Sequence, residues 1–216
     1  MGRRAGEPRK PDLNLERELL RGGSLYVAGL DEVGRGAWAG PIVAAAVLLP
    51  VRVRSLSGKL KGVRDSKQMS PGQRQRWDRR IRELACGVGV GEASREEVDR
   101  IGVVAATRLA MERALQRLPL PPDYLLIDYL RLPEIAIPQL SIVHGDARCL
   151  SIAAASVVAK VARDRLMVEL EAVHPGYGFA AHKGYGTRGH RAALESLGAS
   201  PVHRMSFAPL AGFSRR

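Results

Sequence analysis

Four acidic residues occupy unusual positions, because each lies at or inside an apolar stretch of the sequence. Asp31 and Glu32 directly follow an apolar run and precede a cluster of glycines. Asp128 interrupts a second apolar run, and Asp146 precedes a third. Burying a negative charge costs several kcal/mol unless a positive charge offsets it. We therefore expect an arginine or a bound metal ion to accompany these acids.

Each acid also has a simpler explanation when it is taken alone. A single Asp in a strand is often an edge residue or half of an ion pair, and Asp146 fits the N-cap of a helix. Adjacent residues of a regular strand face opposite sides, so Asp31 and Glu32 cannot both reach one ion without a bend. The glycines that follow permit a bend that turns Glu32 back. Taken together, carboxylate ligands suit Mg²⁺ or Mn²⁺ rather than zinc.

The elements that must position these acids follow from apolar runs, glycines and helix caps. Ser70 before Pro71 predicts a helix start, and Ser94 with Glu97 predicts a capping box. We expect helices over 71–85, 94–118, 147–173 and 188–197, and strands over 25–32, 41–53, 86–94, 121–130 and 140–146. This order predicts an α/β protein with a mixed five-stranded sheet flanked by helices and a small helical C-terminal portion.

The domain organisation that we expect is simple. Residues 1–23 are a polar N-terminal segment, frayed or forming a short helix; residues 24–210 form one catalytic domain; and residues 211–216 are a basic tail. The sequence has no apolar run long enough to span a membrane and no signal peptide, so we expect a cytoplasmic protein. We also expect the chain to act as a monomer. Two distant cysteines, Cys86 and Cys149, predict neither a disulfide nor a zinc site.

The charge of the chain is strongly positive and unevenly distributed. Lys and Arg total 34 against 22 Asp and Glu, which gives a net charge of +12. Residues 52–82 hold eleven Lys or Arg and two Asp, so this stretch contributes +9. Such a concentration predicts a face that attracts polyanions, with nucleic acid as the first candidate. The alternative is a solvated arginine-rich helix. Carboxylate-bound metal beside a basic face indicates phosphodiester chemistry with two ions.

Five motifs in order carry a family resemblance. GLDEVGRGAWAGPIVAAAV, DSKQMS, LLIDYL, GDARCLSIAAASVVAKVARDR and HKGYGT resemble the ribonuclease HII family, over about 26–207. The resemblance implies a ribonuclease H-like fold and a two-metal endonuclease that uses Mg²⁺ or Mn²⁺. It also implies hydrolysis of RNA in RNA/DNA hybrids and nicking on the 5′ side of single ribonucleotides in DNA, which leaves 3′-hydroxyl and 5′-phosphate ends. Such an enzyme would serve DNA replication and repair.

The resemblance also assigns roles to particular residues. The metal ligands of the family are all carboxylates and correspond to Asp31, Glu32, Asp128 and Asp146. The loop that senses the ribose 2′-hydroxyl corresponds to Gly34, Arg35 and Gly36. The tyrosine that packs on the adjacent deoxyribose corresponds to Tyr185.

Several of these roles have alternatives in the sequence itself. Only a 2′-hydroxyl distinguishes RNA from DNA at one nucleotide, and glycines permit close backbone approach; the same glycines also suit a tight turn. Arg35 either contacts substrate or neutralises the acids. Lys67 and Lys183 are candidate phosphate contacts, although surface lysines often have no specific role. Four charged residues of the long helix stay unassigned: Lys160, Arg163, Asp164 and Arg165.

Two residues depart from the family pattern, and three rival functions are weaker. Tyr129 stands where the family commonly has glycine, and Trp38 where smaller residues are usual; activity is still expected. An ATP-dependent phosphotransferase would need a phosphate loop that the sequence lacks. A non-catalytic binder would not need four acids, and ribonuclease HIII would carry a longer N-terminal extension. The tail SFAPLAGFSRR lacks the spacing of a sliding-clamp peptide, so it does not support a clamp interaction.

Overall fold

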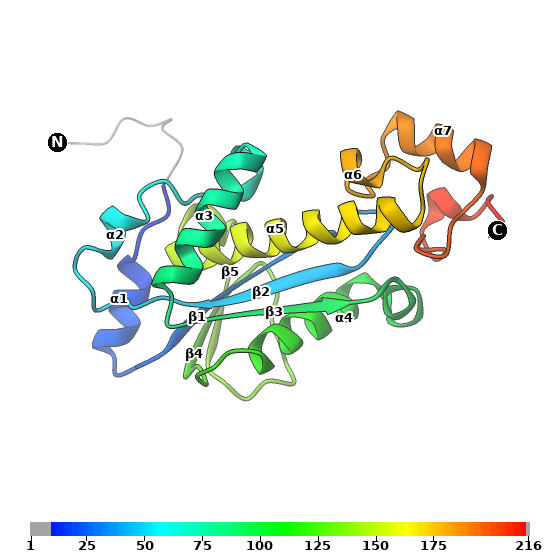
Figure 1. Cartoon of the computed structure of the whole chain (residues 1–216). Coiled ribbons are helices and arrows are strands. Elements are labelled where there is room, and N and C mark those ends of the chain that lie inside the picture. The colour runs from blue at the N-terminus through cyan, green and yellow to red at the C-terminus, as the bar shows by residue number, and fades with distance from the viewer. Residues whose placement is uncertain (1–9, 215–216) are drawn as a thin grey trace, which may run out of the picture.

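A five-stranded mixed sheet forms the centre of the protein (Figure 1). The computed structural model describes residues 10–214; the ends of the predicted N-terminal segment (1–9) and basic tail (215–216) lie outside the described residues. In the sheet order β3-β2-β1-β4-β5, the first three strands are antiparallel neighbours, and β4 and β5 run parallel to β1. The bounds are β1 Val27–Val33, β2 Ile42–Leu48, β3 Gly87–Ala93, β4 Tyr124–Asp128 and β5 Gln139–Ile142. The predicted fold class is confirmed.

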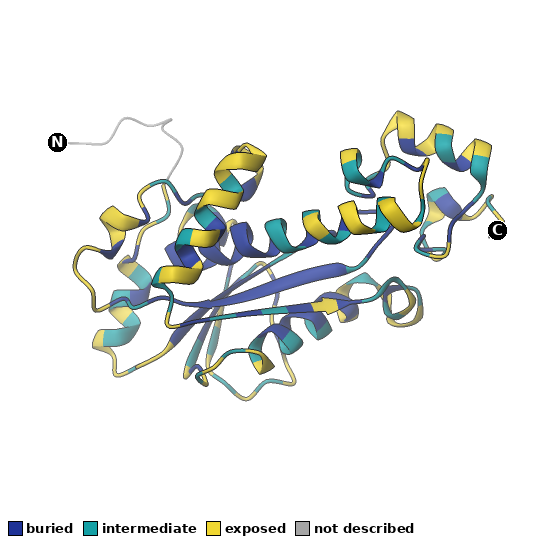
Figure 2. Ribbon diagram, in the orientation of Figure 1, coloured by how far each residue is buried: buried dark blue, intermediate teal, exposed yellow. Residues whose placement is uncertain are grey.

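Strand β2 shows why the sheet needs cover on both faces. All seven of its residues are buried, which matches its uninterrupted apolar sequence IVAAAVL. Ala45 and Val47 belong to a core cluster with the long helix α5 (Leu150–Val173) on one face. Ala44 and Ala46 belong to a second cluster with α4 (Arg95–Gln116) on the other face. Figure 2 shows the buried residues concentrated in β2 and in the first half of α5.

The remaining helices lie around this three-layer centre (Figure 1). Helix α3 packs against α5, and α6 meets α5 nearer the C-terminal end of that helix. Their bounds, with those of the shorter elements, are α1 Asn14–Arg21, α2 Leu56–Lys59, α3 Pro71–Leu84, α6 Phe179–His182, α7 Arg188–Leu197, and the 3-10 helices η1 Ser66–Gln68, η2 Gly145–Ala147 and η3 Ala208–Leu210. No helix among residues 10–214 is both long and apolar enough to cross a membrane.

Local capping signals account for the starts of α3 and α4. The Ser70 hydroxyl accepts from the Gln73 backbone N–H at 3.3 Å, and the Gln73 side chain accepts from the Ser70 N–H at 3.0 Å. Ser94 and Glu97 make the same reciprocal pair. Both predicted helix starts are confirmed, because each signal lies within four residues of the chain.

The start of α5 is different, and the alternative explanation of Asp146 as its N-cap is wrong. Asp146 lies in η2, and Cys149 is the N-cap residue without a side-chain cap bond. The free N–H groups are satisfied by a distant segment instead: Glu16 Oε1 accepts from the Ser151 N–H at 2.9 Å and from the Ser151 hydroxyl at 2.7 Å. Helix α1 therefore completes α5, and Asp146 is left available for another role.

The C-terminal portion has a small core of its own. Phe179, Tyr177 and Leu194 belong to a buried cluster that also includes Met167 of α5. Two buried histidines lie within this portion, and His190 Nε2 is 2.9 Å from His203 Nε2. The predicted helical portion at the C-terminus is confirmed, and it is anchored on the far half of α5.

Candidate active site

The carboxylates gather where β1 and β4 end. Leu30 pairs with Ile127 in the parallel register, so Asp31 and Asp128 are the next residues on neighbouring strands. The Gly145 N–H donates to Asp128 Oδ1 at 2.7 Å, which holds η2, with Asp146, beside the strand ends. Parallel strands therefore bring together three acids that are far apart in the sequence.

Glu32 joins this group without the predicted bend. Pairing with β2 continues through Glu32 and Val33, so β1 stays regular and the predicted turn back is wrong. Asp31 and Glu32 lie near the end of β1, next to Asp128, the last residue of β4. The charge of Asp128 acts on Glu32, and Arg35 Nη1 lies 3.3 Å from Glu32 Oε1.

The acids are poorly compensated within the protein. Burial, together with the charges of Glu32 and Asp128, raises the pKa of Asp31 well above its usual range. Burial also raises the pKa of Glu32, although Arg35 opposes this, and burial with the charges of Asp65 and Asp128 raises the pKa of Asp146. Perturbed acids that share one place are typical of functional sites.

The donor set fits a divalent cation. All four side chains offer hard carboxylate oxygens, and Glu32 Oε2 is buried without a hydrogen-bond partner. Among the described residues, no three His, Cys, Asp or Glu side chains are close enough to form a ready-made metal site. The unpaired oxygen and the raised pKa values nevertheless indicate that positive charge is needed here, which a cation would supply.

Lys67 lies at the rim of this group. It is exposed on η1, and the hydroxyl groups of the neighbouring Ser66 and of Ser156 on α5 are hydrogen-bonded at 2.9 Å. Burial lowers the pKa of Lys67, but the charges of Asp65, Asp31 and Asp146 outweigh it, so the pKa is raised overall. A lysine cation is thus held next to the acids with its ammonium accessible.

The loop after β1 contains two glycines with different surroundings. Gly34 has φ of +95°, and a Cβ built on it would overlap the Arg163 side chain. Gly36 is exposed, and a Cβ built on it would meet no atom within 4 Å. Gly34 is therefore required by the fold, whereas the backbone at Gly36 is open to a ligand. Arg35 between them is one-third exposed and pairs with Glu32.

Two fully buried arginines hold this loop in place. Arg204 Nη1 donates to the carbonyls of Gly34 at 2.8 Å and Arg35 at 3.0 Å, and its Nε and Nη2 donate to the Gly40 carbonyl. Arg163 donates to backbone carbonyls of the same loop and to the Lys183 carbonyl at 2.9 Å. Neither role was predicted from the sequence: Arg163 was unassigned, and Arg204 was not among the candidate residues. A charge inside the apolar pattern of α5 was a usable signal for Arg163, but Arg204 had none.

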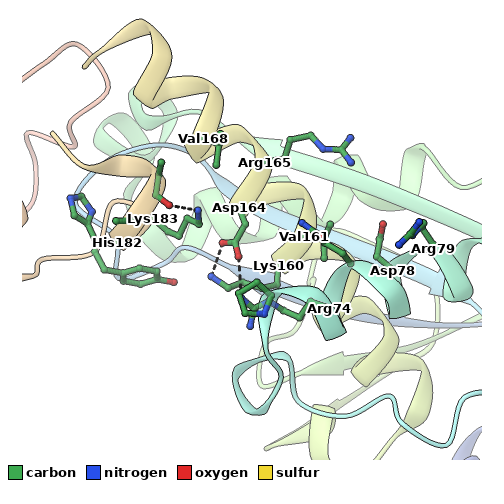
Figure 3. Close-up of a pocket in the computed structure, with 15 residues that line it drawn as sticks. Arg74, Asp78, Arg79, Lys160, Val161, Asp164, Arg165, Val168, His182 and Lys183 are labelled. Atoms are coloured by element: carbon green, nitrogen blue, oxygen red, sulfur yellow. Dashed lines mark hydrogen bonds and ion pairs between the residues drawn. The ribbon is translucent and has the colours of Figure 1, made fainter. Parts of the chain in front are cut away.

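The same arginine connects the loop to the predicted tyrosine. The Arg163 guanidinium lies 5.5 Å from the centre of the Tyr185 ring, and the Tyr185 side chain is half-buried. Tyr185 and Lys183 line a groove of about 910 Å³ between α3, α5 and the segment after α6. Figure 3 shows Lys183 facing Asp164 and Lys160 across this groove. The predicted substrate residues therefore divide between the carboxylates and the groove, with Arg163 in between.

The two departures from the family pattern have distinct surroundings. Tyr129 adopts a left-handed conformation with φ of +58°, which glycine adopts more easily. Its ring is 61% exposed and lies 5.9 Å from the Arg35 guanidinium, so it does not fill the space among the acids. Trp38 contacts His190 of the C-terminal portion with 5.4 Å between ring centres. Trp38 thus joins the loop to the C-terminal helices.

A mixed sheet with acids at neighbouring strand ends, beside an open loop and a basic groove, is the arrangement expected of a metal-dependent phosphodiester hydrolase. The chain belongs to the ribonuclease HII family, whose model, described as Ribonuclease HII, matches residues 28–210. It is therefore a nuclease of the hydrolase class.

Individual proteins agree with this assignment. The chain is 52% identical to the Ribonuclease HII of Chloroflexus aurantiacus over 93% of this chain and 94% of that protein. The ribonuclease H2 structure of Pyrococcus horikoshii has the same fold, with a TM-score of 0.74, 24% identity, and 87% and 96% of the two chains covered. The structure of the PCNA:RNase HII complex of Archaeoglobus fulgidus matches with a TM-score of 0.67 and 28% sequence identity. The match covers 80% of this chain and 88% of that chain.

Proposed function

We propose that the protein hydrolyses the RNA strand of RNA/DNA hybrids and nicks DNA on the 5′ side of embedded single ribonucleotides, leaving 3′-hydroxyl and 5′-phosphate ends. The observation that carries this proposal is the placement of uncompensated carboxylates next to the open backbone at Gly36. An acid cluster alone serves many phosphodiester reactions. An accessible glycine loop beside the acids offers backbone groups that can hydrogen-bond to a ribose 2′-hydroxyl, the group that distinguishes RNA from DNA.

Four carboxylates would hold the metal ions: Asp31, Glu32, Asp128 and Asp146. Two bound divalent cations, Mg²⁺ or Mn²⁺, supply activation of the attacking water and stabilisation of the leaving oxygen. Hydrogen bonds within the protein orient two of these carboxylates before any metal ion binds. The Gly145 N–H orients the Asp128 carboxylate, and Ser156 donates to Asp31.

The remaining residues select and position the substrate. The backbone at Gly36 lies open for hydrogen bonds to a 2′-hydroxyl, which is both donor and acceptor. The Arg35 guanidinium, paired with Glu32, stands where it can contact the same nucleotide while it partly neutralises the acids. Tyr185 offers a ring to the neighbouring deoxyribose, and Lys67 and Lys183 offer cations to phosphates. One copy of the chain supplies all of these residues, which supports action as a monomer.

The test is cleavage of a labelled DNA duplex that carries one ribonucleotide. We expect a nick on the 5′ side of the ribonucleotide with Mg²⁺ or Mn²⁺ and none with EDTA. The 5′-phosphate and 3′-hydroxyl are checked by ligation of the nick. Cleavage only within a long RNA–DNA hybrid would remove the single-ribonucleotide role, and no cleavage of either substrate would overturn the proposal.

A further inference from the structure

The groove that contains Lys183 and Tyr185 continues onto a strongly basic surface of α3. Figure 3 shows Arg74 and Arg79 on one side of the groove and Arg165 of α5 on another. A second hollow of about 370 Å³ lies on the neighbouring side of α3, between Trp77 and Lys59. Arg79 lines both hollows, so the two are parts of one surface.

Some cations in the groove are already neutralised. Asp164 accepts from Lys160 Nζ at 2.7 Å and pairs with Arg74 Nη2 at 3.4 Å. Asp78 pairs with Arg82 at 3.1 Å, where Arg82 lies outside the groove lining. The pair of Arg74 with Asp164 joins α3 to α5, whereas the other two pairs lie within a single helix. These paired cations have little charge left for a ligand.

A second set of cations remains without partners. Among residues 10–214, four exposed basic side chains on this surface form no ion pair or side-chain hydrogen bond: Lys59, Arg76, Arg79 and Arg165. Arg76 and Arg79 are three residues apart on α3, so they lie on the same helix face. We name these four residues the basic strip. An unbalanced row of cations of this kind attracts a polyphosphate chain.

One residue of the basic strip, Arg165, lies to one side of the carboxylates. Ser156, which donates to Asp31, and Arg165 are nine residues apart on α5, or about 14 Å along the helix axis. Nucleotides in one strand of a duplex are spaced by about 3.4 Å, so this distance spans roughly four base pairs. A duplex that reached the strip would therefore extend well beyond the nucleotide at the carboxylates.

We propose that the basic strip binds the phosphate backbone of duplex DNA that flanks the cleavage site on one side. The inference rests on the proposed function, because it places the scissile nucleotide at the carboxylates. Two features commit it to nucleic acid: the unpaired guanidinium groups, which suit phosphate oxygens, and the continuity of the strip with the groove of Lys183 and Tyr185. Contacts to backbone phosphates carry no sequence information, so the strip strengthens binding at any site.

The test uses duplexes of equal length with one ribonucleotide at the centre or about four base pairs from either end. The variant is Arg79→Gln with Arg165→Gln, two residues of the strip that line the same groove, and the matched control is Arg21→Gln with Arg100→Gln, two exposed arginines on α1 and α4. The control removes the same charge from other surfaces. Because Arg165 lies on one side of the carboxylates, we expect kcat/KM of the variant to fall about tenfold for the central substrate and for one end-placed substrate only.

Binding of an all-DNA duplex, followed by fluorescence anisotropy, tests the strip without cleavage. The slope of log Kd against log salt should become shallower by about 2 in the variant, since two phosphate contacts are lost. Equal losses of kcat/KM on both end-placed substrates, or equal losses in the control variant, would overturn the proposal that the basic strip binds flanking DNA. If the wild-type protein cleaved no substrate but the anisotropy difference persisted, the proposed function would fail while the strip stood.

Discussion

Charged side chains of both signs are buried in this protein, and the two groups differ in how well their hydrogen bonds are satisfied. Arg163 and Arg204 are fully buried, and neither forms an ion pair with a described residue; backbone carbonyls accept from their guanidinium groups instead. The buried acids have too few donors, and Glu32 Oε2 has no partner. In this protein the buried arginines have hydrogen-bond acceptors and stabilise a loop, whereas the acids at the strand ends lack compensating charge and are candidates for ligand binding.

The largest effect should come from removing one of the uncompensated acids. We expect Asp31→Asn to lower cleavage by at least about 10³-fold, because a metal ligand and its charge are lost. Duplex binding should persist, and the free energy of unfolding should not fall, because a repulsive charge has been removed. Single-turnover cleavage and anisotropy measure the two properties. Turnover near that of the wild type would exclude Asp31 as a metal ligand.

The opposite pattern is expected for a satisfied arginine. Arg204→Met keeps most of the side-chain volume but leaves the carbonyls of Gly34, Arg35 and Gly40 without donors. We expect the free energy of unfolding in urea to fall by roughly 3–5 kcal/mol. Arg188→Met, at an exposed position of α7, is the control and should change it by less than about 0.5 kcal/mol. If both variants were equally stable, the loop would not depend on Arg204.

The buried histidines predict a loss of stability in acid. Burial lowers the pKa of His190 and of His203 to about 4, against an ordinary value of 6.5. The unfolded chain binds protons more readily in this window, so stability is full above pH 6.5 and is lost as the pH falls toward 4. Between pH 7 and pH 5 we expect a loss of roughly 2–4 kcal/mol, measured by urea unfolding. His190→Gln should show a flatter profile; an unchanged profile would exclude this histidine as the source.

Gly34 and Gly36 separate structure from recognition within one loop. Gly34→Ala forces a side chain into a positive φ and against Arg163, so we expect a loss of about 2 kcal/mol of stability. Gly36→Ala should unfold at the temperature of the wild type, yet discriminate less well between a ribonucleotide and a deoxyribonucleotide. Thermal unfolding and the ratio of kcat/KM values measure the pair. If Gly34→Ala and Gly36→Ala unfolded at the same temperature, Gly34 would not be the structural glycine of the two.

The smallest effect concerns Tyr129. Replacing it with glycine relieves a left-handed conformation that costs about 1–2 kcal/mol, but makes the unfolded chain more flexible by about 0.4–1 kcal/mol. We therefore expect Tyr129→Gly to raise the free energy of unfolding by about 0.5–1 kcal/mol. Tyr129→Ala keeps the strain without the ring and should gain nothing. A glycine variant less stable than the alanine variant would show that strain is not the cost here.

The sequence predicted the parts of this protein that depend on short-range patterns. Apolar runs located the five strands, and Ser70 and Ser94 located two helix starts because their partners lie three residues away. The errors concern contacts between distant segments. Asp146 was a plausible cap only while the bond from Glu16 to Ser151 was unknown.

The candidate site was predictable for a similar reason, up to a point. The four acids stood out because charges are rare in apolar runs, and the parallel register of β1 and β4 brings Asp31 and Asp128 together. The predicted bend at Glu32 is absent, because β1 continues its pairing with β2 through Val33. Arg204 could not be found, since its partners are backbone carbonyls about 164–170 residues earlier.

The bond between Glu16 and Ser151 has a consequence for how the molecule assembles. Its two residues are 135 positions apart, and the Asp12 carbonyl also accepts from Leu150 at 2.8 Å. During synthesis from the N-terminus, α1 emerges long before the helix that it must cap, and closing so long a loop slows folding. Asp146 precedes that helix by only a few residues. The acids therefore meet late, after most of the chain has left the ribosome, so that an unfinished chain has no assembled catalytic site.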